Sequence, residues 1–170
     1  MTEYLDLGFN DISELIPFFW KIRNKQYVTV FPRISVESPE WAQADVFKNA
    51  ALISIRSSKD RRADTKMQFK DALFLEFDDI EFEIAGLKMM DPSQAKLIQD
   101  FVTKNLDSGI RNIICQCEAG ISRSAAIAAA ILKSAGCNDK PIFDFYCPNR
   151  HVYDLVLTEF QKNLDFPRGK

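Results

Sequence analysis

The chain has 170 residues and a formal net charge of −2 at neutral pH, with 46% hydrophobic and 27% charged residues. This length suits one compact domain, and this composition excludes disordered, collagen-like and coiled-coil proteins. Acidic and basic residues nearly balance, which argues against a nucleic-acid-binding protein, because such proteins carry a marked basic excess. We therefore expect a globular domain that does not bind nucleic acid.

No segment of the sequence has the pattern of a membrane anchor or a secretory signal. The longest uninterrupted apolar run, residues 125–132, is far too short to span a bilayer. The first residues are acidic, and no basic region precedes an apolar stretch there. The four cysteines do not resemble a disulfide scaffold in a domain of this size. We expect a cytoplasmic protein without a membrane partner.

The first 26 residues are predicted to form a helical extension ahead of a main domain at residues 27–170. Asn10 or Asp11 can cap a helix in this extension, and its apolar residues recur at helical spacing as far as Phe19.

Predicted strands and helices alternate along the main domain. The predicted strands are residues 27–34, 52–55, 73–77 and 112–116. The predicted helices are residues 39–49, 91–106, an alanine-rich segment at 124–136, and a last helix capped by Asn149. This alternation is typical of an α/β domain with a central, mainly parallel (mixed) sheet that helices flank on both faces.

A charged stretch separates two of these strands. Residues 56–71 hold six basic and three acidic residues with few apolar ones. Such a stretch is typical of a solvated loop or a surface helix. It could alternatively form a basic rim that attracts an anionic substrate.

The segment with the clearest chemistry is residues 117–124, CEAGISRS, between the last predicted strand and the alanine-rich helix. A strand–loop–helix junction directs free N–H groups and the positive end of the helix dipole into the loop, which suits a phosphate. Gly120 permits a tight curl, and Arg123 can hold two phosphate oxygens through its planar guanidinium. In such a cradle Cys117 becomes a thiolate nucleophile, to which Ser124 can donate a hydrogen bond. The candidate phosphate-binding residues are Glu118, Ala119, Gly120, Ile121, Ser122 and Arg123.

The same residues allow two other interpretations. Cys117 could be an inert buried cysteine beside a surface arginine, although the full loop pattern is expected by chance in only about one in a thousand chains of this length. Alternatively, Cys115, Cys117, Cys147 and His151 could bind zinc. A C-x-C pair on a strand is a poor half-site for zinc, and this interpretation leaves the loop glycine and arginine without a role.

Residues 112–136, NIICQCEAGISRSAAIAAAILKSAG, resemble the signature strand, phosphate loop and helix of the cysteine-dependent protein tyrosine phosphatases. The similarity is closer to the compact dual-specificity branch, whose loop commonly ends in G-x-S-R-S. The segments LFLEFDDI and PNRHVY also resemble the bacterial and phage phosphatase-like proteins of that branch. The resemblance covers roughly residues 50–160. It implies a dual-specificity-phosphatase-like fold and hydrolysis of phosphomonoesters through a cysteinyl-phosphate, with Cys117 as nucleophile and neither metal nor cofactor.

The resemblance also implies a general acid, an aspartate on the loop after the strand that precedes the long helix. Alignment on residues 73–77 favours Asp79, with Asp78 as the alternative. Asp91 is nearer to Cys117 in sequence, but it is the expected cap of the helix that begins at Pro92.

The chain departs from the family at one position beside the nucleophile. The family usually has a histidine there that supports thiolate formation, whereas this chain has Gln116. We therefore expect Cys117 to be less activated than in its relatives. The opposing hypothesis to an enzyme is a pseudophosphatase, a phosphate-binding interaction module.

The loop side chains also suggest a substrate class. No Lys or Arg lies between Cys117 and Arg123, and Glu118 would repel a polyanion. We therefore expect a phosphorylated protein or peptide as substrate. By resemblance, this would be phosphotyrosine and also phosphoserine or phosphothreonine. The oligomeric state is left open.

Overall fold

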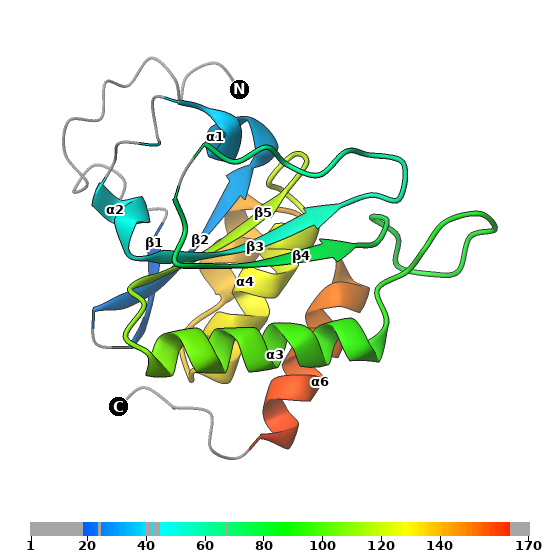
Figure 1. Ribbon diagram of the computed structural model, residues 1–170. Helices are drawn as coiled ribbons and strands as arrows, with labels where there is room; N and C mark the ends of the chain where they lie inside the picture. The colour runs from blue at the N-terminus through cyan, green and yellow to red at the C-terminus, as the bar shows by residue number, and fades with distance from the viewer. Residues whose placement is uncertain (1–18, 24, 40–41, 43–44, 67, 164–170) are drawn as a thin grey trace.

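The computed structural model describes residues 19–163, apart from residues 24, 40–41, 43–44 and 67. Within this part of the chain, five strands form one sheet in the order β1-β2-β5-β3-β4. The strands are β1 (Phe19–Arg23), β2 (Gln26–Pro32), β3 (Ala50–Arg56), β4 (Asp71–Glu76) and β5 (Asn112–Cys117). Strand β1 is antiparallel to β2, and the other neighbours are parallel. The expected mixed, mainly parallel sheet is confirmed (Figure 1).

Helices cover both faces of this sheet, as expected. They are α1 (Arg33–Glu37), α2 (Asp45–Lys48), α3 (Pro92–Asp107), α4 (Arg123–Ser134), α5 (Lys140–Phe145) and α6 (Arg150–Lys162). The larger buried cluster joins the sheet to α3, α4 and α6. A smaller cluster joins the opposite face to α1, α2 and the β3–β4 connection. None of the described helices is long and apolar enough to span a bilayer.

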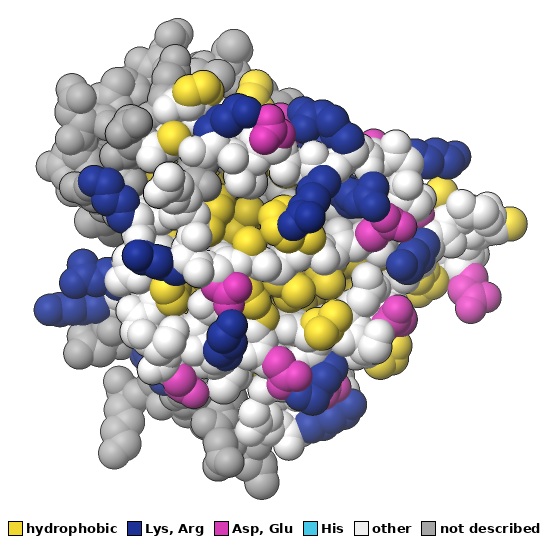
Figure 2. Space-filling model, viewed as in Figure 1, with side chains coloured by type: hydrophobic (Ala, Val, Ile, Leu, Met, Phe, Trp, Pro, Cys, Tyr) yellow, Lys and Arg dark blue, Asp and Glu magenta, His cyan; other side chains and the backbone are white. Residues whose placement is uncertain are grey.

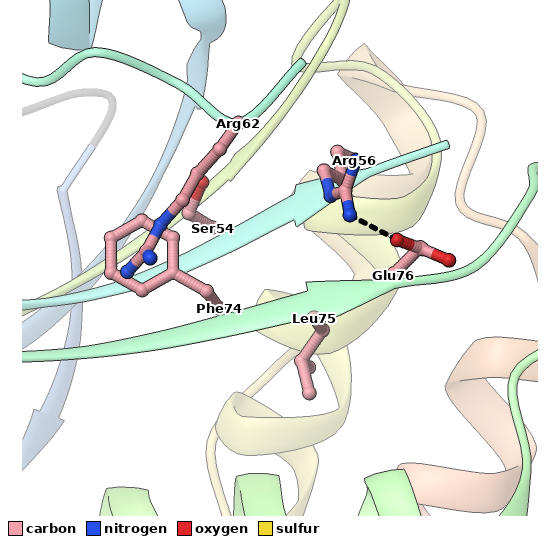
Figure 3. Close-up of a pocket in the computed structure, with 6 residues that line it drawn as sticks. All are labelled: Ser54, Arg56, Arg62, Phe74, Leu75 and Glu76. Carbon is pink, nitrogen blue, oxygen red and sulfur yellow. Dashed lines mark hydrogen bonds and ion pairs between the residues drawn. The ribbon is translucent and has the colours of Figure 1, made fainter. Parts of the chain in front are cut away.

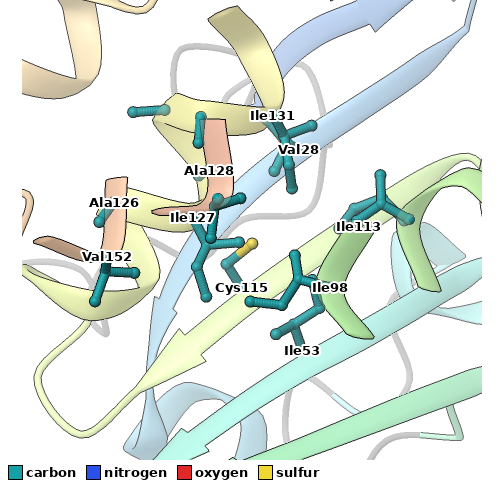
Figure 4. Packing of buried hydrophobic residues seen from close by; sticks show 14 of the residues in the cluster. Val28, Ile53, Ile98, Ile113, Cys115, Ala126, Ile127, Ala128, Ile131 and Val152 are labelled. Atoms are coloured by element: carbon teal, nitrogen blue, oxygen red, sulfur yellow. The ribbon is translucent and has the colours of Figure 1, made fainter. Parts of the chain in front are cut away.

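Helix α4 packs directly on the sheet because its side chains are small. Every residue from Arg123 to Leu132 is buried, and five of those residues are alanines, so the helix axis can approach the strands closely. Figure 4 shows Ile127 of this helix beside Cys115 of β5 and Ile98 of α3. Burial raises the pKa of the Cys115 thiol, so this cysteine is a core residue and not a nucleophile.

Two helix starts follow the sequence signals closely. The Asp91 side chain accepts a hydrogen bond from the Gln94 N–H at 3.1 Å, and the Gln94 side chain accepts one from the Asp91 N–H, which completes a capping box. At α6, the Asn149 side chain accepts a hydrogen bond from the Val152 N–H at 3.0 Å. Asp91 is thus the cap of α3.

The structure differs from the sequence prediction near the start of the chain. The helix expected from Asn10 or Asp11 lies mainly outside the described residues, but its expected last residue, Phe19, begins β1 instead. Because β1 pairs with β2, the sheet begins before residue 27, where we expected the main domain to start. Phe19 and Ile22 are buried in this strand, whereas the helical periodicity had assigned Phe19 to the preceding segment.

Three further boundaries differ. The strand expected at residues 27–34 ends at Pro32, and α1 begins at Arg33. Of the helix expected over residues 39–49, the structure shows the single turn α2 near its end, while residues 40–41 and 43–44 lie outside the described residues. Helix α5 was not expected, although Pro141 in its first turn is a helix-start signal.

Candidate active site

The strand β5 ends at Cys117 and helix α4 begins at Arg123, so residues 118–122 form a loop at the carboxyl end of the parallel strands. This is where the sequence placed the phosphate loop, and ligands of open α/β sheets generally bind at this edge. The carbonyls of Glu118, Ile121 and Ser122 accept hydrogen bonds from backbone N–H groups of surrounding segments. In the described structure, the N–H groups of residues 119–122 donate to no acceptor. The loop therefore presents free donors, as an anion-binding loop does.

Only glycine fits at the centre of the loop. Gly120 has a φ of +65°, which side chains resist, and a Cβ atom there would lie 2.5 Å from the Pro32 nitrogen. Gly120 thus lets the loop pack against the end of β2 while it curls, in agreement with the role expected from the sequence.

The Arg123 side chain is buried beneath the loop and held by two hydrogen bonds. Its Nη1 donates to the Ser57 Oγ at 3.0 Å and to the Phe77 carbonyl at 2.8 Å. Its Nε is also buried, yet it has no hydrogen-bond partner among the described residues. A buried unpaired donor costs about 1–3 kcal/mol, which a bound oxyanion would recover. Arg123 is therefore fixed at one nitrogen and has donors left for a ligand.

Cys117 lies at the base of the loop and is 2% exposed. Its Sγ is 3.0 Å from the Ser124 Oγ, so the pairing expected from the sequence is present in the structure. A hydroxyl that donates to sulfur stabilises the thiolate form.

Gln116 occupies the position where the related phosphatases usually have histidine. Its side chain is fully buried, and its Nε2 donates to the Cys117 carbonyl at 2.8 Å. Its Oε1 accepts a hydrogen bond from the Ser54 Oγ at 2.5 Å. The amide therefore ties the end of β5 to β3 and fixes the backbone of the nucleophile. This role could not be predicted from the sequence, because Ser54 lies 62 residues away.

Asp79 contacts the phosphate loop directly. Its Oδ1 accepts a hydrogen bond from the Ser122 Oγ at 2.8 Å and from the Asn149 Nδ2 at 2.9 Å. Asn149, expected only as a helix cap, thus also holds the candidate acid. The side chain of Asp79 is exposed, as a group that protonates a leaving oxygen must be.

Asp78, the alternative acid, closes the base of a long connection, residues 78–88, that we call the acid loop. Its N–H donates to the Lys88 carbonyl, and its carboxylate accepts from the Lys88 N–H, both at 2.7 Å. The Ser58 N–H and Oγ also donate to it. The Lys88 N–H above all, together with Ser58 and the nearby Arg123 charge, lowers the pKa of this buried carboxyl. Asp78 is therefore engaged in holding the loop.

Glu118 is not a free negative charge in the loop. Its carboxylate forms an ion pair with the Arg33 Nη1 at 2.9 Å, so the repulsion of polyanions expected from the sequence is largely offset. Arg33 begins α1 directly after β2, next to β5, and its Nη2 donates to the Arg61 carbonyl. Arg33 was not predicted as a site residue. Its place follows from the parallel pairing of β2 with β5, since the carboxyl ends of such strands meet, and no local sequence pattern gives that pairing.

The charged stretch at residues 56–71 is the β3–β4 connection, a loop of the kind expected for a charge run. Its Arg61 pairs with Glu37 of α1 at 2.7 Å, and this hydrogen bond lowers the pKa of Glu37. Figure 2 shows Lys and Arg side chains over α1 and this connection, with acidic side chains among them. Three of the six basic residues of this stretch, Arg56, Arg61 and Lys66, form ion pairs among the described residues.

A pocket of about 180 Å³ lies over strands β3 and β4 and does not include Cys117 or Arg123. Figure 3 shows its lining: Ser54, Arg56, Arg62, Phe74, Leu75 and Glu76. Arg56 forms an ion pair with Glu76, and the guanidinium of Arg62 lies over the Phe74 ring, 3.1 Å from its centroid. The charged side chains that line the pocket therefore pair with other residues of its lining.

The alternative zinc site is not assembled. Within the described residues, no group of three or more His, Cys, Asp and Glu side chains is arranged to hold a metal ion. A ring nitrogen of His151 is 2.9 Å from the Met90 carbonyl, and Cys115 faces the core. Cys147 is exposed, and its N–H donates to the Ile121 carbonyl of the phosphate loop.

Similar folds are found among solved structures. A human tyrosine phosphatase-like serine/threonine/tyrosine-interacting protein aligns with a TM-score of 0.57 and 20% identity, over 85% of this chain and 95% of that chain. A mouse putative dual specificity phosphatase complexed with zinc tungstate aligns with a TM-score of 0.56 and 14% identity, over 92% of this chain and 94% of that chain. Human DUSP28 aligns with a TM-score of 0.55 and 12% identity, over 84% of this chain and 95% of that chain.

The chain has the fold of the dual-specificity phosphatases. No protein-family model and no curated protein sequence matches it. At these identities the likeness establishes the dual-specificity phosphatase fold alone.

Proposed function

We propose that this protein is a cysteine-dependent phosphatase that hydrolyses phosphorylated protein side chains, phosphotyrosine and also phosphoserine or phosphothreonine. The observation that carries the proposal is the arrangement around residues 117–123. Among the described residues, the N–H groups of 119–122 have no acceptor, and the buried Nε of Arg123, at the start of α4, has no partner. Cys117 directly precedes this loop. These donors match the equatorial oxygens of a phosphoryl group in transfer.

In the first step the Cys117 thiolate attacks phosphorus, and the bond from phosphorus to the leaving oxygen breaks. Asp79 donates its proton to that oxygen, while Arg123 and the loop N–H groups hold the other oxygens. In the second step Asp79 takes a proton from water, and the water oxygen attacks phosphorus. The sulfur–phosphorus bond breaks, which releases phosphate and restores the thiolate. The steps require neither metal nor cofactor.

One observation favours a second candidate, a phosphate-binding interaction module. Gln116 stands where the related phosphatases have a histidine that supports the thiolate. A module would bind a phosphopeptide through the same loop and release it unchanged. Turnover therefore separates the two candidates.

The test is hydrolysis of para-nitrophenyl phosphate and of a phosphotyrosyl peptide by the full chain. We expect turnover that vanadate inhibits and EDTA does not affect, and we expect Cys117→Ser to abolish it. Cys137→Ser is the matched control, because the Cys137 Sγ donates to the Ile22 carbonyl on a strand outside the site. Absence of turnover, or turnover that survives in Cys117→Ser, would overturn the proposal.

A further inference from the structure

The acid loop carries exposed apolar side chains next to the candidate active site. Phe82 is 70% exposed, Ile84 is 41% exposed and Leu87 is 38% exposed. Figure 1 shows this loop, between β4 and α3, extending beyond the body of the molecule, and Figure 2 shows hydrophobic side chains at its surface. Single exposed apolar residues are common, but three on one loop beside a binding site indicate an interaction surface.

The loop is held in place at both of its ends, so the apolar groups have a defined position. The reciprocal hydrogen bonds between Asp78 and Lys88 close its base. On the side of the phosphate loop, the Ile80 carbonyl accepts from the Asn149 side chain at 3.2 Å, and the Glu81 carboxylate accepts from the Arg150 N–H at 2.6 Å. The apolar side chains therefore follow directly after the Asp79–Ser122 contact.

A fourth apolar side chain belongs to the phosphate loop itself. Ile121 is 40% exposed, and it directly precedes Ser122, the residue that bonds to Asp79. Through this hydrogen bond, Ile121 lies close to the start of the acid loop, at the side of the site where Asp79 lies. We call these four residues, Phe82, Ile84, Leu87 and Ile121, the apolar rim.

The charges around the apolar rim distinguish between a peptide and a lipid surface. Besides the buried Asp78, the acid loop exposes three acidic residues, Asp79, Glu81 and Glu83, against a single lysine, Lys88. Glu83 makes no ion pair among the described residues. Acidic groups beside the apolar side chains would repel an anionic bilayer, whereas they would attract a basic residue of a peptide.

We propose that the apolar rim binds a bulky apolar side chain within a few residues of the phosphorylated residue in a protein substrate, with a basic residue of the substrate near Glu83. This inference rests on the proposed function, because it extends the same site. The rim would contribute selectivity for the peptide and no part of the chemistry. Burial of one large side chain corresponds to about a tenfold preference or more.

The test measures binding of labelled phosphotyrosyl peptides to the full chain carrying Cys117→Ser, which does not depend on turnover. Two peptides share a lysine and differ only in an isoleucine or a serine next to the phosphotyrosine. We expect the isoleucine peptide to bind about tenfold more tightly. Adding Phe82→Ser and Ile84→Ser should remove this preference, whereas Leu97→Ser, at a 49% exposed position on α3, should preserve it. Glu83→Gln should weaken binding of both peptides.

Equal affinity for the two peptides, or a preference that survives the double substitution, would overturn the rim proposal. Sedimentation with phosphatidylserine vesicles that depends on Phe82 and Ile84, without peptide preference, would replace it with a lipid surface. The outcome is separate from that of the enzyme proposal. Turnover of para-nitrophenyl phosphate without peptide preference refutes only the rim, and peptide preference without turnover refutes only the enzyme.

Discussion

Asp78 and Asp79 are adjacent in sequence, yet the structure gives them different surroundings. Asp79 is exposed and contacts the phosphate loop through Ser122, while Asp78 is buried at the base of the acid loop with Lys88 and Ser58. The two carboxylates are held by different partners, and in the described structure the Asp79 carboxylate bonds to the phosphate loop while that of Asp78 bonds to Lys88 and Ser58.

We predict that Asp79→Asn lowers kcat for a phosphotyrosyl peptide by about 10²–10⁴-fold, the usual span for loss of a general acid. The loss should be smaller for para-nitrophenyl phosphate, whose leaving group is stable without a proton. The basic limb of the pH–rate profile should also flatten. Asp78→Asn should act weakly on kcat, and the opposite order of the two variants would assign the acid to Asp78.

Gln116 shows that a residue can depart from a family pattern and still keep a hydrogen bond to the nucleophile's backbone. Its amide bonds to the Cys117 carbonyl and to Ser54, and it does not titrate. The loop geometry therefore does not depend on the protonation of a side chain at this position.

We predict that Gln116→Leu leaves two buried polar groups unpaired and slows alkylation of Cys117 by iodoacetamide near neutral pH about tenfold. Gln99→Leu is the matched control, since Gln99 is a buried glutamine on α3 that bonds to Thr103, away from the site. If both variants alkylate at the wild-type rate, Gln116 has only a packing role.

At the scale of elements, the acid loop depends on the hydrogen bonds that the Asp78 carboxylate accepts at its base. The Asp78 carboxylate accepts hydrogen bonds from two backbone N–H groups, which lowers its pKa. A carboxyl whose folded pKa is lowered stabilises the protein above its unfolded pKa of about 3.9, and this stability is lost as pH falls through the lower folded value.

We predict that Asp78→Asn lowers the free energy of unfolding by about 1–2 kcal/mol at pH 7. The difference from the wild type should shrink as pH falls below about 4, because the wild-type carboxyl then becomes protonated. Urea unfolding at pH 7 and at a pH below about 4 measures this difference in the free energy of unfolding. The control Asp154→Asn, at an exposed position on α6, should change stability little. A difference in the free energy of unfolding that does not change with pH would contradict a stabilising role of the ionised Asp78 carboxylate.

The elements differ in how well the sequence predicted them. Helix α3 has a complete local signal, from the Asp91 cap to Pro92, and β5 is a continuous buried strand, so both were predicted within one or two residues. Strand β1 was missed because its place is determined by pairing with β2 and by burial of Phe19 and Ile22, which are long-range effects. Local patterns do not report such contacts.

At the scale of the whole molecule, the parallel strands bring together residues that are distant in sequence. Ser57 follows β3, Phe77 follows β4 and Arg123 follows β5, and all three meet at one edge of the sheet. The sequence identified Cys117 and Arg123 because their spacing is a local pattern. It could not identify Arg33, Ser57 or the second role of Asn149, because these depend on which strands are neighbours.

The most direct test of the proposed chemistry is to trap the phosphorylated intermediate. Full-length protein is mixed with phosphotyrosyl peptide, quenched in acid within milliseconds, digested and analysed by mass spectrometry. We predict that the peptide containing Cys117 gains the mass of one phosphoryl group and that none appears on Cys115, Cys137 or Cys147. Turnover with no phosphoryl group on Cys117 at any quench time, or with the group on another residue, would contradict covalent catalysis at this cysteine.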